Sequence, residues 1–413
     1  MIGERLRAEL VEKYGTPLYV YELDRIGAAR QALFDCLPEK TEVFYAVKAN
    51  PHPEVIRELA APGQTGCKAE ISSAGELSLV LQAGRDPADI LYTGPAKTEH
   101  ELFLALKAGV RLFSAESPAD LAHIGAVARG LGVVADCLLR INDVAVGATG
   151  ARMTGRASQF GIDSELLGEL MPDLRAVPGT VLVGLHFFSQ SNAQDEQALL
   201  AEFGQAVGTA VRLQQQFGVP LRFLDLGGGF ACPYGRTGTP PTYSGLRSAL
   251  EAILDRHLPR WRGNDVRIAV ESGRYLVGAS GTLLLGVRSV KISRGRRFVL
   301  LDGGVNVFGG LSGIGRLLPV EVEVGAGCGA PVASLAGPLC TPGDILARQA
   351  AVPEVVPGGT VAIPNAGAYG PTASLLAFLG RSAPTEVVLR GEEVVSVSRL
   401  ELRRVREHAG KVG

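Results

Sequence analysis

The sequence lacks an excess of either charge and has no long hydrophobic run. Its 41 lysine and arginine residues are balanced by 42 acidic residues, so the net charge is −1 at pH 7 and no basic surface for nucleic acid is expected. No apolar stretch reaches the roughly 18 residues of a membrane-spanning helix. The charged N-terminus is unlike a signal peptide. We therefore expect a cytoplasmic protein that binds neither nucleic acid nor membrane.

Paired cysteines are also absent. The six cysteines stand at positions 36, 67, 137, 232, 328 and 340, without a CxxC pair or a regular spacing. This pattern excludes a disulfide framework and a zinc cage, and it is typical of free thiols in a reducing compartment. We therefore expect no metal site.

The chain has enough length and apolar content for more than one folded core. Hydrophobic residues make up 46% of the 413 residues, and single cores stop growing at about 250–300 residues. Short β-rich segments alternate with helical ones, separated by many of the 53 glycines and 24 prolines. We predict eight such strands, at residues 43–48, 65–71, 89–93, 111–114, 133–141, 180–186, 221–226 and 266–270.

Eight strands that alternate with helices predict an α/β fold, a (β/α)8 barrel, which we assign to residues 28–271. From residue 272 the pattern changes to short β-rich pieces between glycine and proline turns, at residues 281–290, 297–301, 320–324, 359–363, 386–389 and 393–397. Residues 272–413, together with the strand-like N-terminal residues 1–27, therefore predict a mostly β domain.

Two barrel helices carry capping signals at their starts. Ser73 with Glu76, and Thr98 with Glu101, have the spacing of a capping box. A longer helix with an apolar stripe is predicted to end at Gly218. These signals predict where two helices begin and where a third one ends.

One stretch, VFYAVKANP at residues 43–51, places a lysine at the end of the first barrel strand. Barrels of this kind carry their chemistry at the carboxyl ends of the strands. In a partly apolar pocket the pKa of the Lys48 amine would fall, and the amine could attack a carbonyl. The alternative is a lysine that caps an edge strand and points to water.

Further polar and glycine-rich clusters follow later strands. The seventh strand leads into three glycines, residues 227–229, whose backbone N–H groups can approach an anion. Glu271 and Arg274 follow the eighth strand and could hold a protonated ring nitrogen and a phosphate. The sixth strand ends at His186, which could stack on a planar ring as a neutral imidazole. A turn, an ion pair or a structural histidine would also explain each cluster taken alone.

The predicted β domain contains two further reactive side chains in turns. Cys340 stands in GPLCTPGD, residues 337–344, and Tyr369 stands in NAGAYG. Taken alone, each is more typical of turn chemistry than of a site.

Together, these motifs resemble the fold-type III pyridoxal-phosphate decarboxylases, the family of diaminopimelate and ornithine decarboxylases. The matching stretches, in family order, are FYAVKAN, SSAGEL, TGPAK, QFGI, HFFSQ, LGGGF, ESGR, GPLC and GAYG. The resemblance covers almost the whole chain. It implies pyridoxal 5′-phosphate as cofactor, α-decarboxylation of an amino acid, an alanine-racemase-like arrangement of the two domains, and a homodimer with shared active sites.

The resemblance also implies roles for single residues. Lys48 would bond to the cofactor aldehyde, His186 would stack on the ring and Glu271 would pair with the ring nitrogen. Cys340, supplied by the second subunit, would return a proton to Cα. The phosphate would be bound by Ser189, Gly227, Gly228, Gly229, Arg274 and Tyr369. A supporting ionic cluster would comprise Glu70, Glu76 and Arg140.

The substrate region departs from the family pattern. Thr341 stands where members that act on free diamino acids carry an acidic residue, and a distal ammonium left without a partner would be costly. Asp344 remains as a local support, and Phe188 replaces a flexible glycine. These departures resemble the branch that acts on carrier-protein-bound or conjugated amino acids in secondary metabolism. We therefore expect a tethered, acidic aminoacyl substrate.

A glycine-rich segment at residues 142–161 interrupts the barrel pattern. A loop of this length is typical of a functional lid or a solvated segment. Its two arginines, Arg152 and Arg156, would suit either an acidic carrier helix and its phosphopantetheine arm or water.

Three alternative functions remain open at this point. The first is decarboxylation of free diaminopimelate, lysine or ornithine. The second is an amino-acid racemase of the same fold, which would need a second base opposite the lysine. The third is a non-catalytic pyridoxal-phosphate-binding protein, which would end after the barrel rather than continue to residue 413.

Overall fold

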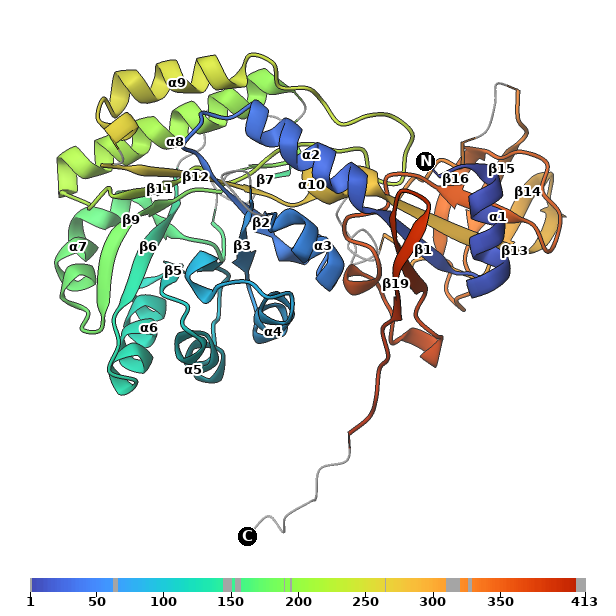
Figure 1. Cartoon of the computed structure of the whole chain (residues 1–413), viewed down its shortest axis with the longest axis horizontal. Coiled ribbons are helices and arrows are strands. Elements are labelled where there is room, and N and C mark those ends of the chain that lie inside the picture. Colours follow the sequence, from blue (N-terminus) through green and yellow to red (C-terminus); the bar gives the residue numbers. More distant parts are fainter. Residues whose placement is uncertain are drawn as a thin grey trace, which may run out of the picture. The chain divides into compact units, whose positions relative to one another are not determined.

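The computed structural model describes residues 2–61, 66–143, 151–152, 157–188, 190–193, 195–263, 265–309, 320–325 and 329–405. The glycine-rich segment at residues 142–161, expected as a lid or a solvated segment, lies partly outside these residues, and so does Arg156. No helix within the described ranges is both long and apolar enough to cross a membrane. The chain forms two units, which we call the barrel unit and the β unit (Figure 1).

Eight parallel strands close into the predicted barrel (Figure 1). Around the ring they are β2 (Glu42–Ala46), β3 (Lys68–Ile71), β4 (Ile90–Tyr92), β5 (Leu112–Ala115), β6 (Ala135–Asn142), β9 (Thr180–His186), β11 (Phe223–Asp225) and β12 (Arg267–Ser272). The ring closes where β12 pairs with β2. A buried hydrophobic cluster draws one residue from each of six strands, as expected for a barrel filled by layers of side chains: Phe44, Leu91, Leu138, Val183, Phe223 and Ala269.

Helices follow the strands and cover the outside of the barrel (Figure 1). They are α2 (Leu23–Asp35), α3 (Pro53–Leu59), α4 (Ala74–Gln82), α5 (Glu99–Ala108), α6 (Pro118–Gly130), α7 (Leu167–Ala176), α8 (Glu196–Phe217), α9 (Leu246–His257) and α10 (Arg274–Val277). The capping box of Thr98 and Glu101 is confirmed, as is the end of α8 at Gly218. The other box is only half present, because the Glu76 carboxylate accepts from the N–H of Ser72 and not from that of the N-cap.

The strand before Lys48 is shorter than predicted. β2 ends at Ala46, and Lys48 lies in a single 3₁₀ turn, Val47–Ala49. The hydroxyl of Tyr45 donates to the Asn50 carbonyl at 2.7 Å, which holds the turn against the strand end. The lysine therefore projects from a fixed turn just beyond the strand.

The barrel unit comprises Leu23–Pro233 and Gly238–Ser280. These bounds differ from the predicted 28–271, because α2 begins directly after the first strand of the chain and α10 packs on α2. The β unit takes Met1–Glu22, Tyr234–Thr237 and Gly281–Gly413.

The β unit is built on a mostly antiparallel sheet that includes the N-terminal strand, as predicted. Its elements are α1 (Glu4–Tyr14), β1 (Leu18–Glu22), β13 (Gly281–Ser293), β14 (Arg296–Leu301), β15 (Val332–Ala336), β16 (Ile345–Ala351), β17 (Thr360–Ile363), β18 (Thr385–Arg390) and β19 (Glu393–Arg399). β1 lies between β13 and β18. Sequence reasoning missed β15 and β16, and residues 320–324, expected as a strand, are irregular.

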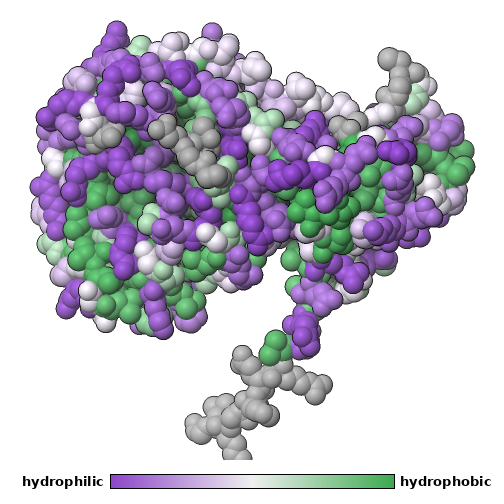
Figure 2. Space-filling view, viewed as in Figure 1, coloured by the Kyte–Doolittle hydropathy of each residue, from purple (hydrophilic) through white to green (hydrophobic). Residues whose placement is uncertain are grey.

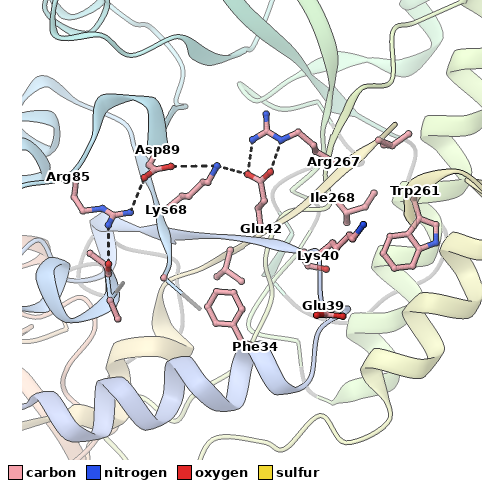
Figure 3. Close-up of a pocket in the computed structure, with 16 residues that line it drawn as sticks. Phe34, Glu39, Lys40, Glu42, Lys68, Arg85, Asp89, Trp261, Arg267 and Ile268 are labelled. Atoms are coloured by element: carbon pink, nitrogen blue, oxygen red, sulfur yellow. Dashed lines mark hydrogen bonds and ion pairs between the residues drawn. The ribbon is translucent and has the colours of Figure 1, made fainter. Parts of the chain in front are cut away.

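A pocket of about 710 Å³ lies at the amino ends of the barrel strands, opposite the strand ends where barrels place chemistry (Figure 3). The Arg267 guanidinium donates two hydrogen bonds, of 2.6 and 2.8 Å, to the Glu42 carboxylate. Lys68 lies 2.9 Å from Glu42 and 3.6 Å from Asp89, and Arg85 reaches Asp89 at 3.7 Å. These mutual ion pairs fix the first residues of β2, β3 and β12, so we interpret this end as structural.

Glu42→Gln is expected to lower the free energy of unfolding of the barrel unit by about 1–3 kcal/mol at neutral pH. Burial, the largest influence, would raise the pKa of Glu42, but Arg267 and Lys68 together lower it. A lowered folded pKa gives stability above the unfolded value of about 4.3, lost as pH falls through the folded value. Denaturant unfolding at neutral and acidic pH measures the difference.

The matched control is Glu39→Gln, which removes an exposed carboxylate from the same pocket. It should leave the unfolding midpoint unchanged at both pH values. A Glu42→Gln loss that stayed constant from neutral pH down to about pH 3 would contradict the ion-pair explanation.

Candidate active site

The carboxyl ends of the barrel strands carry a set of buried polar side chains. These are Glu70 on β3, Ser114 on β5, Arg140 on β6, His186 at the end of β9, Asp225 at the end of β11 and Glu271 on β12. Side chains from different strands converge at this face of a barrel. It is therefore the candidate active site.

Lys48 lies at this face and contacts Glu70. Its Nζ atom is 2.8 Å from Glu70 Oε2 and 5.9 Å from the centre of the Phe188 ring. The Lys48 side chain is 43% exposed, whereas that of Glu70 is 1% exposed. The other oxygen of Glu70 accepts hydrogen bonds from the hydroxyls of Ser72 and Thr93. The amine is thus held by a buried carboxylate and open on one side, rather than enclosed in an apolar pocket.

His186 and Glu271 form the second close contact. His186 Nε2 lies 3.1 Å from Glu271 Oε1, and His186 Nδ1 lies 2.7 Å from Ser114 Oγ. Burial, the largest influence, would lower the pKa of His186, but Glu271 and Asp225 together raise it. Burial would raise the pKa of Glu271, but His186 and Lys48, among other cations, lower it. Both directions favour an imidazolium beside a carboxylate, where the sequence suggested a neutral imidazole.

The turn after β11 brings backbone close to this pair. Gly227 has φ +76°, and a Cβ there would lie 2.2 Å from the Phe187 carbonyl oxygen. A Cβ on Gly228 would lie 2.8 Å from the carbonyl oxygen of Glu271. Gly229 also has a positive φ, +127°. Side chains do not fit at Gly227 and Gly228, so the turn can present backbone to a ligand.

Arg140 is buried at the same face, but its partner was not predicted. Its guanidinium lies 2.8 Å from Glu116, 4.7 Å from the centre of the Phe160 ring and 5.9 Å from that of Phe188. Glu116 directly follows β5. Its position as an acidic residue at a strand end is the sequence signal that could have identified it as a site residue. Phe188 therefore lies close to both the Arg140 guanidinium and the Lys48 amine, each 5.9 Å from its ring centre.

Glu76 lies beside this cluster and not within its ion pairs. Its carboxylate accepts a hydrogen bond of 2.7 Å from the N–H of Ser72. Burial, followed by the charge of Glu70, raises the pKa of Glu76 to about 7. The predicted cluster of Glu70, Glu76 and Arg140 is thus two neighbouring networks, one at Lys48 and one at Glu116.

The remaining predicted residues fall into three places. Arg274 begins α10, two residues after β12 ends. Ser189 lies outside the described residues. The β unit carries the rest, which are Cys340, Thr341, Asp344 and Tyr369.

The turn that carries Cys340 is organised by Asp344. Asp344 is 2% exposed, and its two oxygens accept from the N–H groups of Val305 at 2.8 Å and Leu339 at 2.6 Å. Cys340 is an exposed free thiol, and Thr341 accepts from a backbone N–H within its own turn at 3.3 Å. Asp344 therefore supports the turn, and it is buried there rather than exposed to a substrate group.

The buried atoms at the barrel face that have no hydrogen-bond partner within the described ranges include His186 Nε2, Asp225 Oδ2 and Glu271 Oε1. His186 Nε2 and Glu271 Oε1 are close to each other, but they are not aligned for a hydrogen bond. An unsatisfied buried polar atom costs about 1–3 kcal/mol, so a ligand with a polar group is expected there. Pyridoxal phosphate has a ring nitrogen that suits Glu271, an aldehyde that suits Lys48 and a phosphate that suits the glycine turn. The residues at this face therefore fit this cofactor.

The comparisons with known proteins agree. Residues 23–278 match the family "Pyridoxal-dependent decarboxylase, pyridoxal binding domain". The L-glutamyl-[BtrI acyl-carrier protein] decarboxylase of Niallia circulans is 29% identical over 401 residues, which are 92% of this chain and 90% of that protein. The diaminopimelate decarboxylase of Aquifex aeolicus is 31% identical over 374 residues, covering 88% and 84%.

Solved structures show the same fold. The crystal structure of diaminopimelate decarboxylase from Helicobacter pylori complexed with L-lysine has a TM-score of 0.81 and 27% identity, and the match covers 95% of both chains. Since the family match spans nearly the whole barrel unit, the racemase and the non-catalytic alternatives are set aside. The chain therefore belongs to the pyridoxal-dependent decarboxylases, which confirms the predicted family, cofactor and carboxy-lyase activity.

Proposed function

We propose that this enzyme removes the α-carboxylate of an acidic aminoacyl group tethered to an acyl carrier protein, or otherwise conjugated, in secondary-metabolite biosynthesis. The observation that carries the proposal is the turn around Cys340. Thr341 is neutral there, and both oxygens of the nearby Asp344 are already engaged by backbone N–H groups. A substrate with a distal ammonium would find no exposed carboxylate to neutralise it in this turn, since Asp344 is buried, at a cost of several kcal/mol.

A cation beside this turn supports the same substrate class. Arg381 donates to the Pro338 carbonyl at 3.1 Å, two residues before Cys340. A cation at this place disfavours a cationic substrate end and tolerates a neutral or acidic one. The relative from Niallia circulans is named for a substrate of this kind, whereas several diaminopimelate decarboxylases of similar identity are named for a diamino acid.

We assign the cofactor-binding residues as follows. Lys48 supplies the amine that bonds to the cofactor aldehyde, and Glu70 holds that amine at 2.8 Å. Glu271 holds the proton on the ring nitrogen, and the adjacent His186 packs against the ring. When bound, pyridoxal phosphate supplies the electron sink for the bond that is broken. The phosphate is held by Ser189, Gly227, Gly228, Gly229, Arg274 and Tyr369.

Two further residues act on the substrate. Phe188, close to the Lys48 amine and the Arg140 guanidinium, gives the substrate carboxylate an apolar wall that excludes water. Cys340 then gives its Sγ proton to Cα after CO2 has left. In our proposal the thiol comes from the second subunit of a homodimer, because it stands on an exposed turn of the β unit.

Hydrophobic surface on the β unit supports the homodimer (Figure 2). Residues Ser374 to Phe378 and Leu402 line an apolar pocket of about 580 Å³. Leu375, Phe378 and Leu402 are 39%, 44% and 68% exposed. Exposed apolar groups gathered at one place mark an interaction surface, and we assign it to a second copy of the chain.

Phe378→Asp is expected to weaken the dimer about 10–100-fold, since a charge would enter an apolar contact. Sedimentation at micromolar protein concentration measures the shift towards monomer. Ile292→Asp is the matched control, because Ile292 is 78% exposed on β13 of the same unit. Equal dissociation constants for both variants would exclude this surface as the dimer contact.

The substrate proposal is tested with an assay panel that measures CO2 release. The panel contains free L-lysine, L-ornithine, diaminopimelate and L-glutamate. It also contains glutamate and aspartate joined through their side-chain carboxyl, as thioesters, to a phosphopantetheinylated carrier protein, so that the α-carboxylate is free. We expect turnover of a carrier-bound aminoacyl group and at most trace turnover of the diamino acids. Brisk turnover of a free diamino acid without any of a carrier-bound substrate would refute the proposal.

A further inference from the structure

Three ionisable side chains meet at the ends of neighbouring barrel strands. His186 ends β9, Asp225 ends β11 and Glu271 lies on β12. One donor atom from each lies within 4.8 Å of the others. The three residues are 1%, 0% and 2% exposed. Asp225 is the member of this cluster without a part in the reaction described above.

The two oxygens of Asp225 face different neighbours. Oδ1 accepts a hydrogen bond of 2.9 Å from the N–H of Gly227, in the turn where no side chain fits. Oδ2 is buried and has no hydrogen-bond partner in the described part of the chain. Asp225 thus joins the glycine turn to the pair formed by His186 and Glu271.

Two carboxyl groups at this spacing cannot both be ionised without water around them. The anion of Glu271 is supported by three cations, His186, Lys48 and Arg140. Among the described residues, the negative charges of Glu271 and, more weakly, Glu70 act on Asp225, and the positive charge of His186 acts against them. Burial, followed by the charge of Glu271, raises the pKa of Asp225 to about 7. The proton therefore belongs on Asp225.

We propose that Asp225 is a positioning residue whose neutral form donates its carboxylic O–H to Glu271 and accepts from Gly227, so that the ring-nitrogen partner and the phosphate turn are held as one unit. This inference rests on the roles proposed for Glu271 and Gly227. A neutral group at Asp225 avoids a second anion near the cofactor phosphate, while its O–H orients the one anion that the ring nitrogen needs.

Asp225→Asn and Asp225→Ala test the proposal, because an amide mimics a neutral acid and a methyl group does not. The readout is the dissociation constant of pyridoxal phosphate, measured by visible absorbance after the full-length protein has been stripped and reloaded. At about pH 6 the asparagine variant should bind the cofactor within roughly threefold of wild type, and the alanine variant at least about tenfold more weakly.

At about pH 8.5 the wild-type carboxyl ionises next to Glu271 and the phosphate turn. The asparagine variant cannot ionise and should then bind the cofactor severalfold more tightly than wild type. Cofactor affinity that falls tenfold or more in Asp225→Asn at about pH 6 would overturn the proposal. So would a ratio of the wild-type and Asp225→Asn dissociation constants that is the same at both pH values.

Two controls separate positioning from folding. Asp136→Asn removes an exposed carboxyl from β6 and should change neither affinity nor its pH dependence. Thermal unfolding of the stripped Asp225 variants reports whether they fold. Because the readout is cofactor affinity, the result is independent of which amino acid the enzyme decarboxylates.

Discussion

Lys48→Ala is expected to yield a protein without the visible absorbance of bound cofactor and with decarboxylation slowed by about a thousandfold or more, roughly 4 kcal/mol of transition-state stabilisation. The amine stands on a fixed turn just past β2, and no other described lysine contacts Glu70. Borohydride treatment of the wild-type holoenzyme, followed by mass spectrometry, should mark the peptide that contains residue 48.

The alanine variant also removes the charge partner of a buried carboxylate, so Lys48→Arg is the matched control. Arginine keeps a cation within reach of Glu70 but does not deprotonate to a nucleophile. We expect the arginine variant to unfold at the temperature of the stripped wild type and still to lack the absorbance band. A coloured, active Lys48→Arg protein would show that another amine carries the cofactor.

The barrel could be predicted because its signals are local. Each strand is a short apolar run, and several of the following helices have a start signal of their own, such as the box of Thr98 and Glu101. His186 and Glu271 were found for the same reason, since each stands at a strand end. In a parallel barrel the strand ends share one face, so local predictions place distant residues together.

Long-range pairings could not be predicted from single positions. Glu116 was missed as the partner of Arg140, because the contact depends on how β5 and β6 pair across the barrel. Asp225 stands just before the glycine motif, and nothing in that motif indicated a role for it, although one of its oxygens lies within 4.8 Å of donor atoms of His186 and Glu271 from two other strands. In the β unit, β15 and β16 escaped because their small and polar residues, as in VASLA, carry little strand signal.

Cys340→Ala is expected to keep the visible absorbance of the bound cofactor and to slow product formation about a hundredfold, the usual worth of a positioned proton donor. The colour persists because Lys48 and the barrel face are unchanged, whereas Cα loses the group that protonates it. Amine formed per CO2 released should also fall below that of wild type, because protonation at other positions competes. Cys340→Ser keeps a weaker acid of similar size, so its rate of product formation should fall between those of wild type and Cys340→Ala.

A mixing experiment tests where this thiol acts. Lys48→Ala and Cys340→Ala are each impaired alone, but if the cysteine of one subunit serves the lysine of the other, a mixed dimer contains one intact site. Random exchange gives mixed dimers in half of the population, and so roughly a quarter of wild-type activity. Activity that stays at the sum of the two variants after subunit exchange would place lysine and cysteine in the same subunit's site. In that case the surface around Phe378 would have to be explained without a shared active site.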